Sequence, residues 1–422
     1  MMSRWRWVLT LFARKLWLRV SVMALIGVAT AVAGIVFAPY VPDAWTIKIG
    51  AQAIDGILNV LASSMLSVTV FSMTTMVSAY GAATSNVTPR ATRLLMEDNT
   101  SQNVLGTFIG SFLFSLVGII ALSTGLYGSE GRAILLVVTI GLIALIAVTI
   151  LRWIDYLARF GRLGETVARV EDATWNALRM RRAHPHLGGR AMDDPPPPEA
   201  RAVFGTTVGY VQYVDMAALQ ELAADGALTL FVTAPPGVFA DPARPVAMAA
   251  GEMDDDTALR VAQAFTIGPE RTFDQDPRFG LCVLAEIASR ALSPAVNDPG
   301  TAIDVVSRAV RLLVRWNRCN GPEDDADVAC EDVRVPGVAV EDMFDDVFAP
   351  IARDGAGNLQ VQLRLQKALG SLAVEDEEVF GAAARGHSAK ALRRAEAALA
   401  LPDERHAVAA VAAGIGAVRT GG

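Results

Sequence analysis

The C-terminal half of the chain contains a group of carboxylates with one arginine. These residue types occur in binding sites and active sites. Such a group could bind a divalent cation, hold a polar ligand or transfer protons. Asp276 and Asp298 each precede a proline, and an aspartate at that position is also a typical helix N-cap. The sequence contains no activated nucleophile, glycine-rich phosphate loop or metal triad beside them. A structural role, a ligand site and an enzyme site therefore stay open, and the candidate residues are Arg271, Asp274, Asp276, Asn297, Asp298 and Asp304.

Cysteines and histidines give little support for a metal or redox centre. The chain has three cysteines and four histidines. The cysteines, Cys282, Cys319 and Cys330, match neither the spacing of a zinc site nor a disulfide framework. We therefore assign no catalytic residue, no metal ligand and no cofactor-binding residue, and the cofactor stays unknown.

A second set of polar residues lies on an apolar stretch that is long enough to cross a bilayer. At about 100° per residue on a helix, these residues fall on one face. A polar face on a membrane helix must contact something other than lipid. It could line a pore in a homo-oligomer, or pack against other helices through small side chains and hydrogen bonds. The possible pore-lining residues are Asp55, Asn59, Ser63, Ser67, Thr74 and Ser78.

Two arginines, Arg90 and Arg93, follow this stretch. A short amphipathic helix from Pro89 to Met96 would hold them at the membrane surface. They could couple the spans to the rest of the chain or bind lipid phosphates. An ordinary anchor of basic residues on the cytoplasmic side is the alternative.

A basic stripe is expected farther along the chain, on a helix that begins near Asp298 and ends near Asn317. Asp304 and Arg308 form an i,i+4 pair on it. The acidic stretch 323–327 is a possible internal partner for the stripe, and a solvated face is the alternative. The stripe consists of Arg308, Arg311, Arg315 and Arg318.

The chain contains four apolar segments that are long enough to cross a bilayer, at about 20–37, 56–80, 104–127 and 133–154. The second of them contains or borders the possible pore-lining residues. Basic residues gather before the first segment, after the second and after the fourth. Because basic residues favour the cytoplasmic side, we expect both termini to be cytoplasmic. The predicted fold class is therefore a membrane α-helical protein with four transmembrane helices, followed by a cytoplasmic α+β region and a helical C-terminal region.

The domain boundaries follow from changes of pattern along the chain. We expect a transmembrane domain at 1–155, a helical stalk at 156–190 and a proline-rich linker at 191–200, since four consecutive prolines cannot continue a helix. Alternating β-branched and aromatic residues then predict a small α+β domain at 201–270. The remainder, 271–422, is expected to be mainly helical. The net charge of −7 argues against nonspecific nucleic-acid binding.

Three stretches of the chain resemble a known family. They are SSMLSVTVFSMTTMVSAYGAATSNVTPR at 63–90, LLMEDNTSQNVLGTFIGSFLFSL at 94–116 and RTFDQDPRFGLCVLAEIASRALSPAVNDPGTAIDVV at 271–306. All three are similar to the bacterial predicted membrane proteins of domain of unknown function family 2254. The resemblance implies a multi-pass protein of the bacterial inner membrane with a cytoplasmic C-terminal half. It implies no activity and transfers no catalytic residue.

The leading functional hypothesis is a homo-oligomeric channel-like or transport protein whose second span lines the pathway. The cytoplasmic part would then assemble or gate it. A membrane-anchored sensor or scaffold without transport is the first alternative. An enzyme that uses the cluster between Arg271 and Asp304 is the second. The expected partners are the lipid bilayer and further copies of the same chain, with no nucleic acid.

Overall fold

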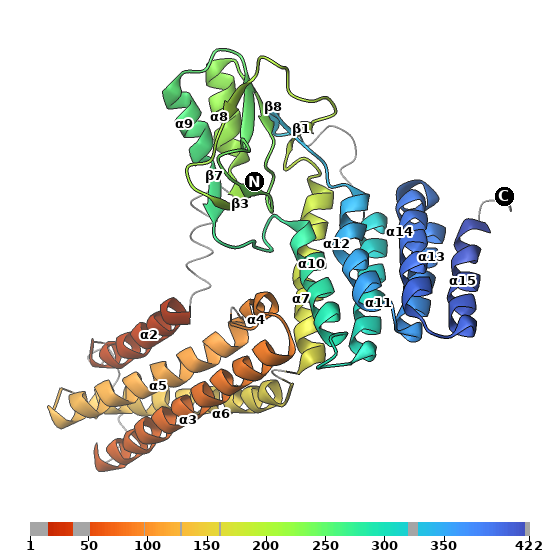
Figure 1. Cartoon of the computed structure of the whole chain (residues 1–422). Coiled ribbons are helices and arrows are strands. Elements are labelled where there is room, and N and C mark those ends of the chain that lie inside the picture. Colours follow the sequence, from red (N-terminus) through yellow and green to blue (C-terminus); the bar gives the residue numbers. More distant parts are fainter. Residues whose placement is uncertain are drawn as a thin grey trace. The chain divides into compact units, whose positions relative to one another are not determined.

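The chain is mostly helical in a computed structural model that describes residues 16–36, 51–96, 98–126, 129–159, 162–319 and 328–417 (Figure 1). The described residues form two compact units, one ending at Thr166 and the other beginning at Val167. We refer to them as the membrane unit and the C-terminal unit.

The membrane unit is built from apolar helices. Three of its helices contain segments long and apolar enough to cross a bilayer, at Gln52–Gly81, Asn99–Ser123 and Gly131–Ala158. These agree with three of the four expected spans. The first expected span overlaps a shorter apolar segment, Trp17–Ala33, so a fourth crossing stays a prediction. The helices are α2 (Leu16–Val36), α3 (Ala51–Asn86), α4 (Pro89–Met96), α5 (Asn99–Ser123) and α6 (Ser129–Arg159).

Helix α5 lies at the centre of the membrane unit and contacts α2, α3 and α6. Its contact with α2 depends on glycine. A Cβ atom on Gly27 would lie 2.3 Å from the carbonyl oxygen of Gly110, and one on Gly110 would lie 2.7 Å from the carbonyl oxygen of Met23. Small residues of this kind let membrane helices approach closely. Phe108 and Leu58 are completely buried in this packing.

One part of the C-terminal unit contains two β-sheets covered by helices (Figure 1). A five-stranded sheet has the order β1-β8-β4-β6-β2, and a three-stranded sheet the order β5-β3-β7. Asp215 caps α8, as its position before an apolar helical pattern predicts, and accepts a hydrogen bond from Ala218 N. The elements are β1 (Gly189–Ala191), β2 (Arg201–Val203), β3 (Gly209–Val214), α8 (Met216–Gly226), β4 (Thr229–Val232), β5 (Phe239–Ala240), β6 (Ala247–Ala250), α9 (Asp255–Gln263), β7 (Phe265–Gly268) and β8 (Cys330–Val335).

The proline-rich stretch, expected to be a linker at 191–200, lies between two strands of one sheet. Strand β1 precedes it, β2 follows it, and both belong to the five-stranded sheet. Strand β8, about 140 residues after β1 in the sequence, pairs with β1 and β4 in parallel. The five-stranded sheet therefore includes strands from Gly189 to Val335. Long-range strand pairing of this kind leaves no local pattern.

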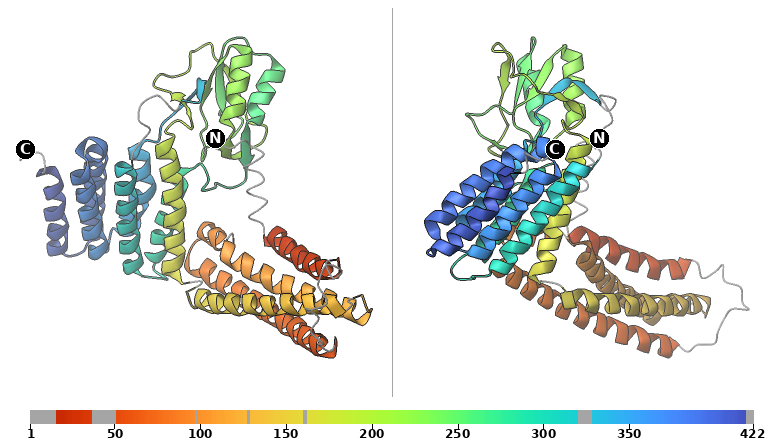
Figure 2. Two further views of the ribbon diagram at one scale, coloured as in Figure 1. Left: turned by 180° about the vertical axis from the view of Figure 1, so that it is seen from behind. Right: turned by 90° about the vertical axis from the view of Figure 1, so that its right-hand side faces the viewer.

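Another part of the C-terminal unit is a set of packed helices (Figure 2). Phe344, Phe348 and Phe380 are fully buried at its centre and contact one another through their rings. Asp276 and Asp298 cap α10 and α11 with proline next to the cap, as predicted. The helices are α10 (Pro277–Ala291), α11 (Pro299–Arg318), α12 (Val340–Asp354), α13 (Leu359–Glu375), α14 (Glu377–Ala398) and α15 (Pro402–Ala417).

Most of the region expected to be a helical stalk, 156–190, is occupied by a helix that packs against this set of helices. Helix α7 (Leu163–Ala183) is separate from α6 and lies against α10 and α11. Its approach to α10 is close, because a Cβ atom on Gly280 would lie 1.9 Å from the hydroxyl oxygen of Thr174. Helix α7 thus presents one side to the interior of the C-terminal unit.

Candidate functional site

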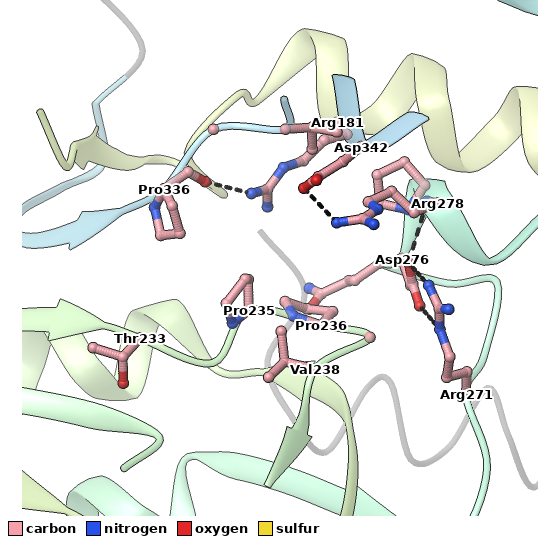
Figure 3. A pocket seen from close by; sticks show the side chains of 15 residues that line it. Arg181, Thr233, Pro235, Pro236, Val238, Arg271, Asp276, Arg278, Pro336 and Asp342 are labelled. Atoms are coloured by element: carbon pink, nitrogen blue, oxygen red, sulfur yellow. Dashed lines mark hydrogen bonds and ion pairs between the residues drawn. The ribbon is translucent and has the colours of Figure 1, made fainter. Parts of the chain in front are cut away.

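A pocket of about 370 Å³ lies within the C-terminal unit, where its sheets and its helices meet (Figure 3). Four segments form it: the end of α7, the turn after β4, the start of α10, and the connection from β8 into α12. Its size falls in the range of small-molecule sites, about 300–1,000 Å³. The lining residues are Arg181, Thr233, Pro235, Pro236, Gly237, Val238, Arg271, Gln275, Asp276, Pro277, Arg278, Pro336, Gly337, Val338 and Asp342.

One wall of the pocket is a closed ion pair. Asp276 is buried, and it accepts hydrogen bonds from Arg271 Nε at 2.7 Å and Nη2 at 3.0 Å. The same carboxylate accepts the backbone N–H groups of Arg278 and Phe279 as the cap of α10. Burial opposes the charge of Arg271, but the two bonds to Asp276 outweigh it and raise the pKa of Arg271. Burial also raises the pKa of Asp276, against the lowering effect of its bonds from Arg271. With two bonds from Arg271 and two from backbone N–H groups, the Asp276 carboxyl is satisfied without any ligand.

The turn at Pro235–Val238 is held against that pair. Gly237 has a φ of +97°, and a Cβ atom there would lie 2.3 Å from Oδ2 of Asp276. Only glycine tolerates both the left-handed backbone and the close approach. The two prolines before it restrict the turn further. The apolar wall formed by this turn is therefore rigid.

A second arginine of the pocket is also paired. Arg278 donates from Nη1 to Asp342 at 2.5 Å and from Nε to Asp346 at 2.7 Å. About a third of its side chain is exposed, and about half of the Asp342 side chain. The pair links the start of α10 to the start of α12 and leaves Arg278 with carboxylates on two sides.

The third arginine is different, since its charge has no carboxylate partner among the residues that the structure describes. Arg181 is only 7% exposed. Its Nη2 atom donates to the carbonyl oxygen of Pro336 at 2.8 Å. Nε and Nη1 are buried and have no hydrogen-bond partner in the described part of the chain. Figure 3 shows the guanidinium of Arg181 pointing into the space between Pro336, Pro235 and Pro236.

Unpaired buried donors are uncommon, because each costs about 1–3 kcal/mol when it is left without a partner. Burial lowers the pKa of Arg181 to about 10, against the opposing field of Asp276. The side chain is therefore still cationic at neutral pH. A buried cation with open N–H donors that faces a cavity is suited to bind an anion.

The residues of the predicted polar cluster are only partly brought together. Arg271 and Asp276 lie in the pocket, and Asp274 lies in the turn that precedes α10. Asn297 and Asp298 lie beyond the far end of α10, which is about 22 Å long for 15 residues. Asn297 has a φ of +51° in the turn before α11, and Asp298 caps that helix.

Asp304 also lies apart from the pocket, on α11, where it pairs with Arg308 as the sequence predicts. This separation does not favour a shared active site. Among the residues that the structure describes, no group of three or more His, Cys, Asp or Glu could hold a metal ion.

The predicted polar stripe of α3 points away from the other helices of the membrane unit. Its buried side consists of residues such as Ile54, Leu58, Met65 and Met76, on the opposite face. The hydroxyl and amide groups mostly bond to carbonyls of the preceding turn. Asn59 Nδ2, Ser63 Oγ, Ser67 Oγ and Thr74 Oγ1 each donate to the carbonyl oxygen four residues earlier. The stripe is exposed except at Asp55, which is half-buried; its members are Asp55, Asn59, Ser63, Ser67, Thr74 and Ser78.

The predicted interface helix at Pro89–Met96 is present as α4 and carries Arg90 and Arg93. Coupling or lipid contact by these arginines stays a prediction. The acidic stretch 323–327, proposed as a partner of the basic stripe on α11, lies outside the described residues. Instead, Arg308 and Arg311 both bind Glu171 of α7, and Arg318 binds Glu375. Arg315 stacks over the ring of Trp175 at 4.0 Å.

Sequence reasoning did not identify Arg181. It stands in the basic run Arg-Met-Arg-Arg at the end of α7, which looks like a favourable C-terminal turn. Its neighbour Arg182 points elsewhere, to the carbonyl oxygen of Cys319 and the ring of Trp316. No local pattern distinguishes the buried arginine from its neighbours.

Three helices that are long and apolar enough to cross a bilayer indicate a membrane protein. Its C-terminal unit contains a pocket lined by charged residues. The chain belongs to the family described as "Predicted membrane protein (DUF2254)", which matches residues 13–371 and confirms the resemblance. Similar proteins include an uncharacterized protein of Mycobacterium bovis and one of Mycobacterium tuberculosis. Each is 31% identical over 264 residues, 60% of this chain and 50% of the relative. The chain spans about half the length of these relatives, and no solved structure matches.

Proposed function

We propose that this protein is a membrane-anchored sensor that binds a small anion in its C-terminal unit. The observation that carries the proposal is Arg181: a buried cation that lines a pocket, and whose Nε and Nη1 atoms have no hydrogen-bond partner within the described chain. Arg271 and Arg278 have carboxylate partners at the same pocket, so the open donors of Arg181 are a local exception. We infer that a ligand supplies the missing acceptors.

A role in signalling is supported by the origin of the pocket walls. An anion on Arg181 would contact α7 together with the turn after β4 and the segment that leads into α12. Helix α7 follows the last candidate span in the chain, with residues 160–162 between α6 and α7. Ligand binding would therefore stabilise the helix that continues from the membrane spans. The basic residues that flank the spans support a cytoplasmic location for this unit, in a multi-pass inner-membrane protein with both termini cytoplasmic.

The test is anion-dependent thermal stability of the full-length protein in detergent. A ligand at 100 times its Kd would add about 2.7 kcal/mol to the stability of the native state. We expect at least one class of anion to raise the Tm of the wild type, and Arg181→Met to abolish that rise. Hydrogen exchange should show protection of α7 and of residues 233–238 on binding.

Arg353→Met is the matched control. Arg353 is an exposed arginine on α12 that pairs only with the adjacent Asp354 among its described contacts. It should leave the anion response unchanged. If carboxylates, phosphate, sulfate and chloride all leave the wild-type Tm unchanged, the sensor proposal is wrong.

A homo-oligomeric channel-like protein is a second candidate, supported by the orientation of the α3 stripe. Its residues point away from the helices of the same membrane unit, so in a bilayer they would contact lipid, water or a second copy. Contact with a second copy would remove Asp55 and Asn59 from lipid, where polar groups are costly. Ion flux in liposomes tests this with Asp55→Asn and Ser67→Leu. Flux that neither variant changes would remove α3 as the pathway.

A further inference from the structure

We infer that the pocket binds a small organic monocarboxylate whose apolar part lies against the proline wall. This inference rests on the proposed function, because it assigns a chemical class to the ligand of the same pocket. It depends on three properties of the lining: the number of unpaired charges, the carboxylates that face the ligand, and the apolar surface opposite Arg181.

The charge of the lining residues favours a ligand with one negative charge. Three arginines line the pocket, and the described carboxylates pair with only two of them. Arg271 is paired with Asp276, and Arg278 with Asp342 and Asp346, whereas the hydrogen bond of Arg181 within the described chain goes to the carbonyl oxygen of Pro336. A single carboxylate on Arg181 would give this third arginine the charged partner that it lacks among the described residues.

The two aspartates act against a doubly charged ligand. Asp342 lines the pocket with its side chain 49% exposed, and Asp346 adds a second carboxylate behind Arg278. The second charge of phosphate or sulfate would lie in the field of these carboxylates, and like charges in a partly buried site repel strongly. A carboxylate avoids this repulsion and still supplies two acceptor oxygens for Arg181.

The surface opposite the guanidinium is apolar. Pro235, Pro236 and Pro336 border the space in front of Arg181, with Val238 beside them (Figure 3). Proline has no backbone N–H, so these residues offer the ligand ring carbons and no amide donor. The hydroxyl of Thr233 is already engaged, since it donates to the carbonyl oxygen of Pro245 at 2.7 Å. A pocket of about 370 Å³ has room for a short aliphatic or aromatic group attached to the carboxylate.

The experiment measures affinity of the full-length protein in detergent for acetate, butyrate and hexanoate. We expect each methylene that is buried against the proline wall to tighten binding by about fourfold. Hexanamide, which has the same chain without the charge, should not bind. Arg181→Met should remove binding of all three carboxylates, and Arg353→Met should remove none.

A variant of the wall tests the apolar contact separately from the charge. Val238→Thr keeps the shape of the side chain and replaces one methyl group with a hydroxyl. It should leave the affinity for acetate unchanged and reduce the gain from acetate to hexanoate. The control is Val208→Thr, an exposed position in the loop before β3, which should change neither. An unchanged gain in Val238→Thr would overturn the contact with the wall.

Two further ligands separate this inference from the proposed function. If inorganic phosphate binds in an Arg181-dependent manner and the carboxylates do not, the ligand class is wrong and the sensor proposal stands. If norleucine, which is hexanoate with an added ammonium group, binds more tightly than hexanoate, the site takes a zwitterion and the monoanion assignment is wrong. If no anion binds, both proposals fail.

Discussion

Two buried charges on the same helix have opposite surroundings. Glu171 and Arg181 both lie on α7 and are 6% and 7% exposed. Glu171 accepts from Arg308 Nη1 at 2.6 Å, from Arg311 Nε at 2.6 Å and from Arg311 Nη2 at 2.7 Å. Arg181 has one bond to a backbone carbonyl and two open nitrogen atoms within the described chain.

The difference separates a structural charge from a charge that is available to a ligand. A buried ion contributes to stability only when partners replace the water it lost. Arginine side chains of α11 provide these partners to Glu171, so this site holds α7 and α11 together. No carboxylate of the described chain reaches Arg181, although Asp276 and Asp342 line the same pocket. Equal burial therefore does not mean equal function. The number of hydrogen bonds that each charged group makes distinguishes the two sites.

The largest effect should come from Glu171→Gln. This variant removes the negative charge that Arg308 and Arg311 share, so that Arg308 keeps only Asp304 and Arg311 loses its described ion-pair partner. We expect a loss of about 3 kcal/mol, at the lower end for a broken buried pair because Arg311 is half-exposed. Thermal unfolding of the full-length protein measures this as a lower Tm. Anion binding should persist at temperatures where the variant is folded, and loss of binding in folded protein would contradict the separation of the two sites.

Gly280→Ala should have the next largest effect, because Gly280 lies against α7 between the two charges. The new methyl group would meet the side chain of Thr174, and overpacking of this kind costs about 1–3 kcal/mol. The displaced α10 also carries Asp276, so the anion-induced rise in Tm should become smaller. Thr174→Ala in the same chain should restore both stability and binding. A double variant as unstable as the single one would contradict this contact.

Arg181→Met should change stability by less and in the opposite direction to Glu171→Gln. Methionine fills a similar space without a charge to bury. In buffer without a binding anion, we expect the free energy of unfolding to rise by about 1 kcal/mol, the penalty of an unsatisfied buried donor. A higher Tm in such a buffer is the measurement. A fall as large as that of Glu171→Gln would show that Arg181 is a structural residue.

The smallest effect should be a difference in acid sensitivity. Burial opposes the charge of Glu171, but its bonds to Arg311 and Arg308 outweigh burial and place its pKa below the ordinary value of 4.5. The stability contributed by this carboxylate is therefore complete above pH 4.5 and is lost as the pH falls through the lower, folded-state pKa. Between pH 5 and 3, the Tm of the wild type should fall more steeply than that of Glu171→Gln. Equal slopes would mean that Glu171 does not titrate differently on folding.

The sequence by itself determined features whose physical causes are local. Apolar length indicated the three helices that can cross a bilayer. Aspartate before proline predicted the caps Asp276 and Asp298, because the cap bonds only the first turn of its own helix. The pair between Asp304 and Arg308 followed from helical spacing alone. Family membership also followed from short stretches of sequence.

Only the tertiary structure decided which charges are paired. Arg181 is one of three arginines in a run of four residues, and its burial depends on the turns at Pro235 and Pro336. Glu171 looks like any charge on an amphipathic helix until α11 brings two arginines to it. Strand β8 joins β1 across about 140 residues, and that pairing helps to form the side of the pocket that leads to Pro336. Burial and the presence of a partner are set by residues distant in the chain, and no local spacing encodes them.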